Sequence, residues 1–457
     1  METILAVIFG VFFLVLAYRR LDWAFFISIA ALPAYLLRFS LGPLPSTMLE
    51  VMILATFVGW FAKNLPAIKK SLIGQLTRQS YPFALETVLI LAIAFLALIP
   101  SGFSLSSLGI WRAYFFEPLL LFIVAANLFA QKKNRKYFLY ALAASALAAS
   151  LLAIYQKLTG DLITNPYWAD LATRRVTSWF PYPNALGLYL APIAAILAVA
   201  GLGCLEKKSY RQATIYWTIA VLATVSIYFA KSDGALVALA ASAFLVLLLW
   251  KSWSRKAVLV LAIVGLEVLW LSPYRQAVID KFTLFDLSGQ IRKQQWAETW
   301  QLLKHDQVWL WGTGLDNYQP MIAPYHQDGI FVENHDPDWY RKVVWDDEYK
   351  AQVWQPVEIY KYPHNIFLNF WTELGLLGLL AFIWLFSKAI WLAIRTWNSK
   401  EEGRYYGLAS FAAIIAILVQ GLVDVPYFKN DLSTFFWVLL AWIGMTDREY
   451  RPIWKKK

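Results

Sequence analysis

One stretch of the sequence places side chains that can move a proton beside a membrane-length apolar segment. Pro363, His364 and Asn365 directly precede a long apolar run, and the longest polar segment of the chain, roughly 273–362, ends just before them. Histidine is the usual proton carrier near neutral pH, although a lone histidine is more often structural. We therefore expect chemistry at this junction, with His364 as the candidate base and Asn365 as a candidate contact to a polar ligand.

A carboxylate lies deeper in the same apolar segment. Glu373 follows His364 by about two and a half helical turns. Ionisable groups are costly in lipid and are candidates for function by default. Two interpretations stay open at this point: Glu373 supports the site, or it bonds to a neighbouring helix.

Two arginines precede a second apolar segment. Arg174 and Arg175 lie in an aromatic-rich stretch that leads to Pro183 and Asn184, and Asn184 is a natural N-cap for the helix that follows. A planar guanidinium can hold a phosphate through two hydrogen bonds. Solvated loop charge is the alternative interpretation of this pair.

Further cations occur in two other polar segments. Lys231 opens the break Lys231-Ser-Asp-Gly234 between apolar runs, which could equally be a simple chain reversal. Arg292 lies in a helical pattern in which Trp296, Trp300 and Leu303 share one face. This stripe predicts packing against the membrane surface or the core of the loop itself, and it lets Arg292 point toward the same mouth as His364.

The composition shows what must position these residues. Hydrophobic residues make up 59% of the 457 and charged residues only 16%, too few to cover a soluble protein of this length. Apolar runs of about 17–20 residues recur, which is the length that crosses a bilayer. The sequence therefore predicts an all-α polytopic transmembrane bundle of 12–13 spans with one large extracytoplasmic loop containing short helices. The expected spans are 3–18, 22–37, 47–62, 83–101, 112–130, 137–155, 185–203, 213–230, 235–250, 257–271, 364–394, 406–423 and 432–446.

The placement of the basic residues predicts the orientation. The net charge is +11, and Lys and Arg gather at alternate junctions and in the C-terminal tail. The positive-inside rule puts that set in the cytoplasm, so that the long segments 156–184 and 272–363 face outward. Because topology accounts for these cations and they cluster on no single face, the chain is not expected to bind nucleic acid.

The expected organisation follows from these spans. Residues 1–160 form N-terminal transmembrane helices, 161–272 central helices with the outward arginine loop, 273–362 the extracytoplasmic loop, 363–447 C-terminal helices, and 448–457 a basic cytoplasmic tail. The single cysteine, Cys204, excludes a disulfide framework and a multi-cysteine metal site. The acidic residues of 273–362 form no ordered metal motif and predict a solvated face. No metal site and no cofactor are expected.

The ordered pieces together resemble the O-antigen ligase and O-antigen polymerase family over roughly residues 170–430. The pieces are Arg175 with Pro183-Asn184, Ser232-x-Gly234, Arg292 with Trp296 and Gly312-x-Gly314, Pro363-His364-Asn365 with Glu373-Leu-Gly375, and Gly421-Leu-Val-Asp424. One departure is that many relatives carry Ser-Arg-Gly where this chain has Ser232-Asp233-Gly234. Whether Lys231 replaces that cation is left open by the sequence.

The resemblance implies a membrane glycosyltransferase of the bacterial inner membrane, with its site facing outward, in cell-envelope or lipopolysaccharide biogenesis. It would move a glycan from an undecaprenyl diphosphate carrier to a glycan, lipid or protein acceptor, without metal and with inversion at the anomeric carbon. By position, Arg175 and Arg292 would hold the diphosphate and His364 would act as the base. Arg174, Asn184, Lys231, Asn365 and Glu373 are the expected substrate contacts.

Two other classes of function compete with this one. A transporter or flippase of lipid-linked glycan would line a path through the bilayer with charges and carry paired broken helices. A membrane scaffold would tolerate changes at His364. The concentration of polar groups at one face favours catalysis, but the sequence does not choose between ligase and polymerase.

Overall fold

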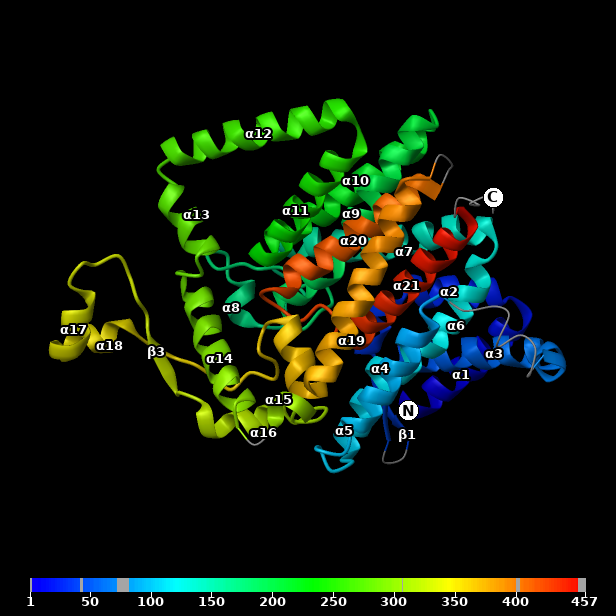
Figure 1. Ribbon diagram of the computed structural model, residues 1–457, viewed down its shortest axis with the longest axis horizontal. Coiled ribbons are helices and arrows are strands. Elements are labelled where there is room, and N and C mark those ends of the chain that lie inside the picture. Colours follow the sequence, from blue (N-terminus) through cyan, green and yellow to red (C-terminus); the bar gives the residue numbers. More distant parts are fainter. Residues whose placement is uncertain (1, 42–43, 72–81, 306, 400–402, 451–457) are drawn as a thin grey trace, which may run out of the picture.

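The computed structural model describes all residues except 1, 42–43, 72–81, 306, 400–402 and 451–457. The protein is almost entirely helical (Figure 1). The helices of its first half are α1 (Glu2–Arg19), α2 (Leu21–Ala30), η1 (Leu32–Leu36), α3 (Met48–Ser71), α4 (Ala84–Leu96), α5 (Leu105–Trp111), η2 (Arg112–Phe116), α6 (Glu117–Phe129), α7 (Lys132–Thr159), α8 (Pro166–Ala169), α9 (Pro183–Glu206) and α10 (Tyr210–Phe229).

The second half continues the bundle and adds a polar segment of short elements. Two antiparallel hairpins, β1 (Arg38–Leu41) with β2 (Leu44–Thr47) and β3 (Gly329–Phe331) with β4 (Trp354–Pro356), are the sheets of the described residues. The remaining helices are α11 (Asp233–Trp250), α12 (Ser252–Leu271), α13 (Arg275–Phe282), α14 (Leu287–Leu303), α15 (Val308–Trp311), α16 (Tyr318–Ile322), η3 (Ala323–Tyr325), α17 (Trp339–Trp345), α18 (Asp347–Val353), α19 (Ile366–Trp397), α20 (Gly403–Gly421) and α21 (Asn430–Tyr450).

The predicted polytopic helical bundle is confirmed. Eight helices of the described residues are long and apolar enough to cross a membrane, and a ninth span is formed if the bent pair of α12 with α13 and α14 counts as one. Three shorter apolar helices, α1, α2 and α4, coincide with further expected spans. The expected count of 12–13 exceeds the eight because those three are short and because α12 and α21 do not qualify on their own. Of the predicted basic tail, 451–457 lies outside the described residues.

The centre of the bundle is built from helices with small side chains. α9 is buried over most of its length, and it packs against α10 and α20, while α21 packs against α6. Alanine and glycine let helix backbones approach closely where lipid offers no hydrophobic gain for association. The bundle thereby gains a tightly packed centre that can hold its helix ends, and the polar loops between them, in fixed positions.

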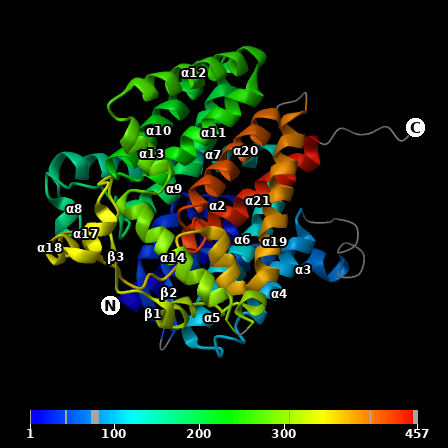
Figure 2. The same cartoon turned by 60° about the vertical axis from the view of Figure 1, so that its left-hand side comes forward.

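The polar segment returns to the bundle beside the start of α11. α12 leaves the end of α11, and the helix pair that follows it is bent by 114° from it. Figures 1 and 2 show α13 and α14 descending beside the bundle, while α17, α18 and β3 lie at the edge of the molecule. An ion pair between Lys281 and Asp233 holds α13 beside the start of α11. This arrangement places α14 next to the N-terminal end of α19.

The polar segment has a small hydrophobic core of its own. Leu302 and Leu303 of α14 are buried with Val308, Tyr318 and Ile322, and Leu368 of α19 completes the cluster. The three residues of the predicted stripe therefore lie in different surroundings. Leu303 enters the loop core, Trp296 is half-buried against it, and Trp300 stays exposed and meets Trp371 edge to face.

A glycine pair fixes the start of α19. Gly375 breaks the helix with a φ of 71° and a ψ of −176°, a conformation essentially restricted to glycine. Gly312, with a φ of 75°, lies against it, since a Cβ on Gly312 would be 2.6 Å from the Gly375 nitrogen. The break frees the carbonyl of Thr372, which accepts a hydrogen bond from the Thr313 hydroxyl at 3.0 Å. The Gly312-Thr-Gly314 segment thus packs into the break of α19.

We expect Gly375→Ala to destabilise the protein by about 2 kcal/mol or more. The new Cβ would lie 2.2 Å from the Leu310 carbonyl oxygen, and alanine is strained at this φ and ψ. Thermal unfolding of the purified protein in detergent measures the loss as a lower Tm.

Gly265→Ala is the matched control. A Cβ on Gly265, within exposed α12, would meet no atom within 4 Å. This change should leave the Tm equal or slightly higher, because alanine favours a helix over glycine. An equal Tm for the two variants would mean that the break at Gly375 is not required.

Candidate functional site

The segment before α19 is held in place by two neighbouring residues of α14. The side-chain amide of Gln295 donates to the Tyr362 carbonyl at 2.6 Å, and the indole of Trp296 donates to the Pro363 carbonyl at 2.8 Å. His364, the next residue, adopts a left-handed φ of 43°, which is uncommon for a residue with a side chain. The two hydrogen bonds offset the cost of this conformation and fix the direction in which His364 leaves the chain.

The same glutamine also holds the imidazole. His364 Nδ1 lies 3.0 Å from Gln295 Oε1. The amide nitrogen of Gln295 is already committed to the Tyr362 carbonyl, so the oxygen is the atom that faces the ring. An amide oxygen can only accept, so Nδ1 carries the proton. Neutral His364 therefore keeps the lone pair on Nε2, the state that a general base requires.

The surroundings of His364 favour the neutral imidazole. Burial lowers the pKa of His364 below its usual value of 6.5; the nearby Asp424 carboxylate opposes this, and the Arg292 guanidinium lowers the pKa further. The ring also packs edge to face against Tyr360, with 4.8 Å between centroids. At neutral pH the group is ready to accept a proton.

Arg292 is brought to the histidine by the loop after α20. Its Nε donates to the Val423 carbonyl at 3.0 Å, and its Nη1 donates to the Ser288 carbonyl at 3.3 Å. Asn365 holds the same loop, since its amide donates to the Leu422 carbonyl at 3.0 Å. The loop at 421–424 therefore joins Arg292 to the segment that carries His364.

Arg175 is the second cation of the site, and it lies beside the start of α11. Its Nε donates to the Ala230 carbonyl at 2.9 Å, and its Nη2 donates to the Asn184 side-chain oxygen at 3.1 Å and to the Lys231 carbonyl at 3.3 Å. Gly234, three residues on, lies against Val423. Arg175 thus contacts the Asn184 side chain and the backbone of Lys231, and the contact of Gly234 with Val423 joins this group to the one around Arg292.

Both arginines keep a terminal nitrogen available. Among the described residues, Arg175 Nη1 and Arg292 Nη2 have no hydrogen-bond partner. Burial lowers the pKa of Arg175 and Asp233 raises it, yet a guanidinium remains protonated at neutral pH. Each arginine is thus fixed on one side by carbonyl oxygens and presents a cationic donor on the other.

Three predicted residues have other local roles in the structure. Arg174 points away from Arg175, because its guanidinium binds the carbonyls of Ala169 and Lys157 at 3.0 and 3.1 Å. Asn365 is the N-cap of α19, and its oxygen accepts from the backbone of Phe367 and Leu368. Glu373 is fully buried inside α19, about 11 Å along the helix axis from its first turn.

The expected N-cap of α9 was placed wrongly. Tyr182 is the N-cap residue and Pro183 the first residue of α9, so Asn184 lies inside the first turn. Proline favours this first position because it has no amide hydrogen to leave unpaired. The asparagine is thereby free to bind Arg175 instead of a backbone amide.

Two residues of the site were not singled out from the sequence. Gln295 lies three residues after Arg292, on the same side of α14, and this spacing was the available signal. Asp424 belongs to the Gly421–Asp424 segment, and its carboxylate acts on His364 only because the loop folds back to α19. Spacing along the chain gives no sign of that second contact.

Two hollows are lined in part by α14. An apolar groove of about 420 Å³ runs between α14 and α19 and is lined by Trp296, Trp300, Asn365, Phe367, Leu368, Trp371, Leu379 and Ile383. A second hollow of about 670 Å³ lies in the polar segment, where Trp339, Trp354 and Phe331 stand among amide and carboxylate side chains. Gln294 of α14 lines this hollow and is followed directly by Gln295.

Comparison with known proteins found one similar family. Residues 218–383 match the family model described as O-antigen ligase. This segment, less than half of the chain, is similar to that family. It runs from α10 to the kinked part of α19 and contains both Arg292 and His364, whereas Arg175 lies before it. No curated protein matches the chain. The structure thus shows a multi-pass membrane protein, and its segment 218–383 is similar to the O-antigen ligase family.

We predict that Gln295→Leu lowers the turnover of glycan transfer by about tenfold or more. Without the amide, the imidazole loses its fixed tautomer. The fall in rate should be smaller than the whole contribution of a positioned base, which is about 10²–10⁴-fold. The assay is transfer by purified protein at saturating donor. Gln301→Leu, at an exposed position of the same helix, should retain full activity. Equal rates for both variants would remove Gln295 as a positioning residue.

We predict that Asp424→Asn shifts the acid limb of the pH–rate profile to lower pH by about one unit. Asp424 raises the pKa of His364, so removing its charge makes the imidazole harder to protonate, and the base stays active in more acidic solution. The profile of kcat/KM against pH measures the shift. Asp347→Asn in α18 is the control, and a shift toward higher pH in Asp424→Asn would contradict the assignment.

Proposed function

We propose that this protein transfers a glycan from an undecaprenyl diphosphate carrier to an acceptor hydroxyl or amide at the extracytoplasmic face of the bacterial inner membrane. The acceptor is a second lipid-linked glycan, a lipid core or a protein, which separates the polymerase and ligase forms of the same reaction. The observation that carries the proposal is the imidazole of His364, held by Gln295 at Nδ1, with no partner on Nε2 among the described residues. It lies near Arg292, whose guanidinium is fixed on one side by a carbonyl oxygen.

The proposed reaction needs no activation beyond the donor itself. Nε2 of His364 takes the proton of the acceptor group as its oxygen or nitrogen attacks the anomeric carbon. The bond from that carbon to the diphosphate breaks from the opposite face, which inverts the centre. The diphosphate leaves as an anion, and Arg175 and Arg292 hold the charge that develops on it. Fixed donors of this kind are worth about 3–4 kcal/mol each in rate.

The two hollows lined by α14 suit the two parts of such a donor. The groove between α14 and α19 is apolar and opens beside Asn365, one residue from the proposed base, which supports placement of a prenyl tail. The hollow in the polar segment combines tryptophan faces with amide and carboxylate groups. Aromatic faces pack on the apolar sides of sugar rings while polar groups bind hydroxyls, which supports placement of the glycan there.

We expect His364→Ala to abolish transfer of a carrier-linked glycan while protein amount and membrane insertion stay normal. The variant lacks the imidazole that we propose accepts the acceptor's proton. His305→Ala, which changes an exposed histidine of the same polar segment, serves as the control. Full activity of His364→Ala would remove it as the base.

We expect Arg175→Lys and Arg292→Lys to lower kcat/KM for the diphosphate donor by about 10²-fold each. An ammonium cannot hold the carbonyl oxygens and a phosphate at the same time in the way the planar guanidinium does. The assay supplies purified protein with one lipid-linked repeat unit, alone or with candidate acceptors. Lysine variants as active as the wild type would argue against phosphate binding, and the product distinguishes a lengthened carrier-linked glycan from transfer to a second molecule.

A further inference from the structure

A basic pocket lies at the far end of the bundle from His364. It has a volume of about 420 Å³ and is bounded by the end of α6, the start of α7 and the end of α21. α21 begins beside the loop at 421–424 and runs for 21 residues, about 30 Å. The pocket is therefore separated from the catalytic junction by about the thickness of a membrane.

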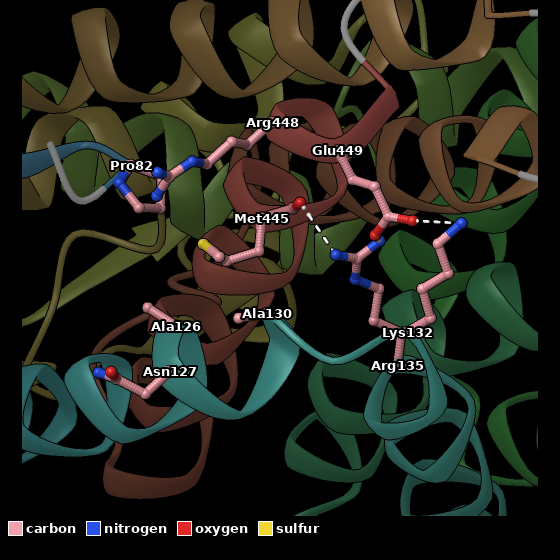
Figure 3. Close-up of a pocket in the computed structure, with 9 residues that line it drawn as sticks. All are labelled: Pro82, Ala126, Asn127, Ala130, Lys132, Arg135, Met445, Arg448 and Glu449. Carbon is pink, nitrogen blue, oxygen red and sulfur yellow. Dashed lines mark hydrogen bonds and ion pairs between the residues drawn. The ribbon is translucent and has the colours of Figure 1, made fainter. Parts of the chain in front are cut away.

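Cations stand on two sides of this pocket. In Figure 3, Arg448 extends along one side, while Lys132 and Arg135 line the other, and Met445 and Ala130 lie between them. Arg135 is 1% exposed. Its Nε donates to the Phe129 carbonyl at 2.9 Å and its Nη2 to the Met445 carbonyl at 3.2 Å. This side chain is built into the wall and cannot turn away.

The cations outnumber the acidic groups that line the pocket. Glu449 pairs with Lys132 at 2.7 Å and with Arg135 at 2.5 Å. Arg448 has no acidic partner among the residues that the structure describes. One carboxylate thus serves three cations, which leaves two positive charges over an apolar floor. An anion in the pocket would complete this balance.

The end of α7 adds to the attraction for an anion. Its N-cap residue, Gln131, makes no side-chain cap hydrogen bond, so that side chain satisfies none of the free amide groups at the positive end of the helix dipole. Lys132, the first residue of that helix, lines the pocket. The helix end therefore acts in the same direction as the side chains, with the buried guanidinium of Arg135 as the fixed member of the group.

We propose that this pocket binds the phosphate headgroup of an anionic phospholipid from the leaflet opposite to the catalytic junction. The ligand chemistry is a phosphate ester, which basic pockets between transmembrane helices bind on the cytoplasmic side. A lipid suits the pocket better than free phosphate, because Ala126, Ala130 and Met445 offer an apolar surface directly below the cations. The bound lipid would hold the ends of α6, α7 and α21 together.

The experiment measures lipid binding by the purified full-length protein with native mass spectrometry. Phosphatidylglycerol is titrated into wild type and into the double variant Lys132→Gln/Arg448→Gln. Both residues are exposed, so the variant should fold, which its Tm in detergent verifies. Lys133→Gln/Arg211→Gln removes the same charge from exposed positions that do not line the pocket and is the matched control.

We expect the Kd for phosphatidylglycerol to rise by about tenfold or more in the double variant and to change by less than about twofold in the control. Phosphatidylethanolamine should bind the wild type more weakly, and excess inorganic phosphate should not displace the lipid. Equal affinities in the double variant and wild type, or equal binding of the two lipids, would overturn the proposal. Displacement by inorganic phosphate would mean a site for the free ion and would overturn it as well.

Discussion

The arrangement of the site depends on how α14 holds Tyr362, Pro363 and His364, just before the N-cap of α19. Gln295 and Trp296 bind consecutive carbonyls, and Gln295 then uses its remaining oxygen on the imidazole. One side chain therefore fixes the position of the backbone and the proton on the ring together. Without these hydrogen bonds the segment would sample many conformations, and nothing would offset the free-energy cost of the left-handed φ of His364. Everything that delivers α14 to this point, including the ion pair between Lys281 and Asp233, serves that contact.

The two arginines are also fixed on one side of the guanidinium, and the other side stays available to a ligand. Arg175 is held by the carbonyls of 230 and 231, and Arg292 by that of Val423. Carbonyl oxygens orient a guanidinium without cancelling its charge, whereas a carboxylate partner would neutralise it. Cations oriented before the reaction need no reorganisation as negative charge develops on a leaving group. The 421–424 loop links these points, because it contacts Arg292, Asn365 and Gly234 and also places Asp424 near the histidine.

The sequence predicted the helical bundle and the junction at His364, since both depend on local patterns. Apolar runs of membrane length form helices, and a polar segment before such a run indicates where the helix meets the membrane surface. It did not predict the role of Gln295, whose partners lie 67 and 69 residues away, nor the effect of Asp424, which arises only from folding. The error at Asn184 has a similar origin. The preceding proline already suits the first helical turn, and the asparagine instead meets an arginine nine residues earlier. The break of α19 at Gly375 was likewise not predicted, because this glycine lies within an apolar segment of membrane length.

The tautomer of His364 tests the central claim most directly, because it follows from the Gln295 contact and from nothing else in the mechanism. Nitrogen NMR of the purified protein with isotope-labelled histidine, assigned by comparison with a His364→Gln sample, reports which ring nitrogen carries the proton. The structure predicts a neutral ring at neutral pH with the proton on Nδ1 and an unprotonated Nε2. A signal from a ring protonated on Nε2, or on both nitrogens, would contradict this account.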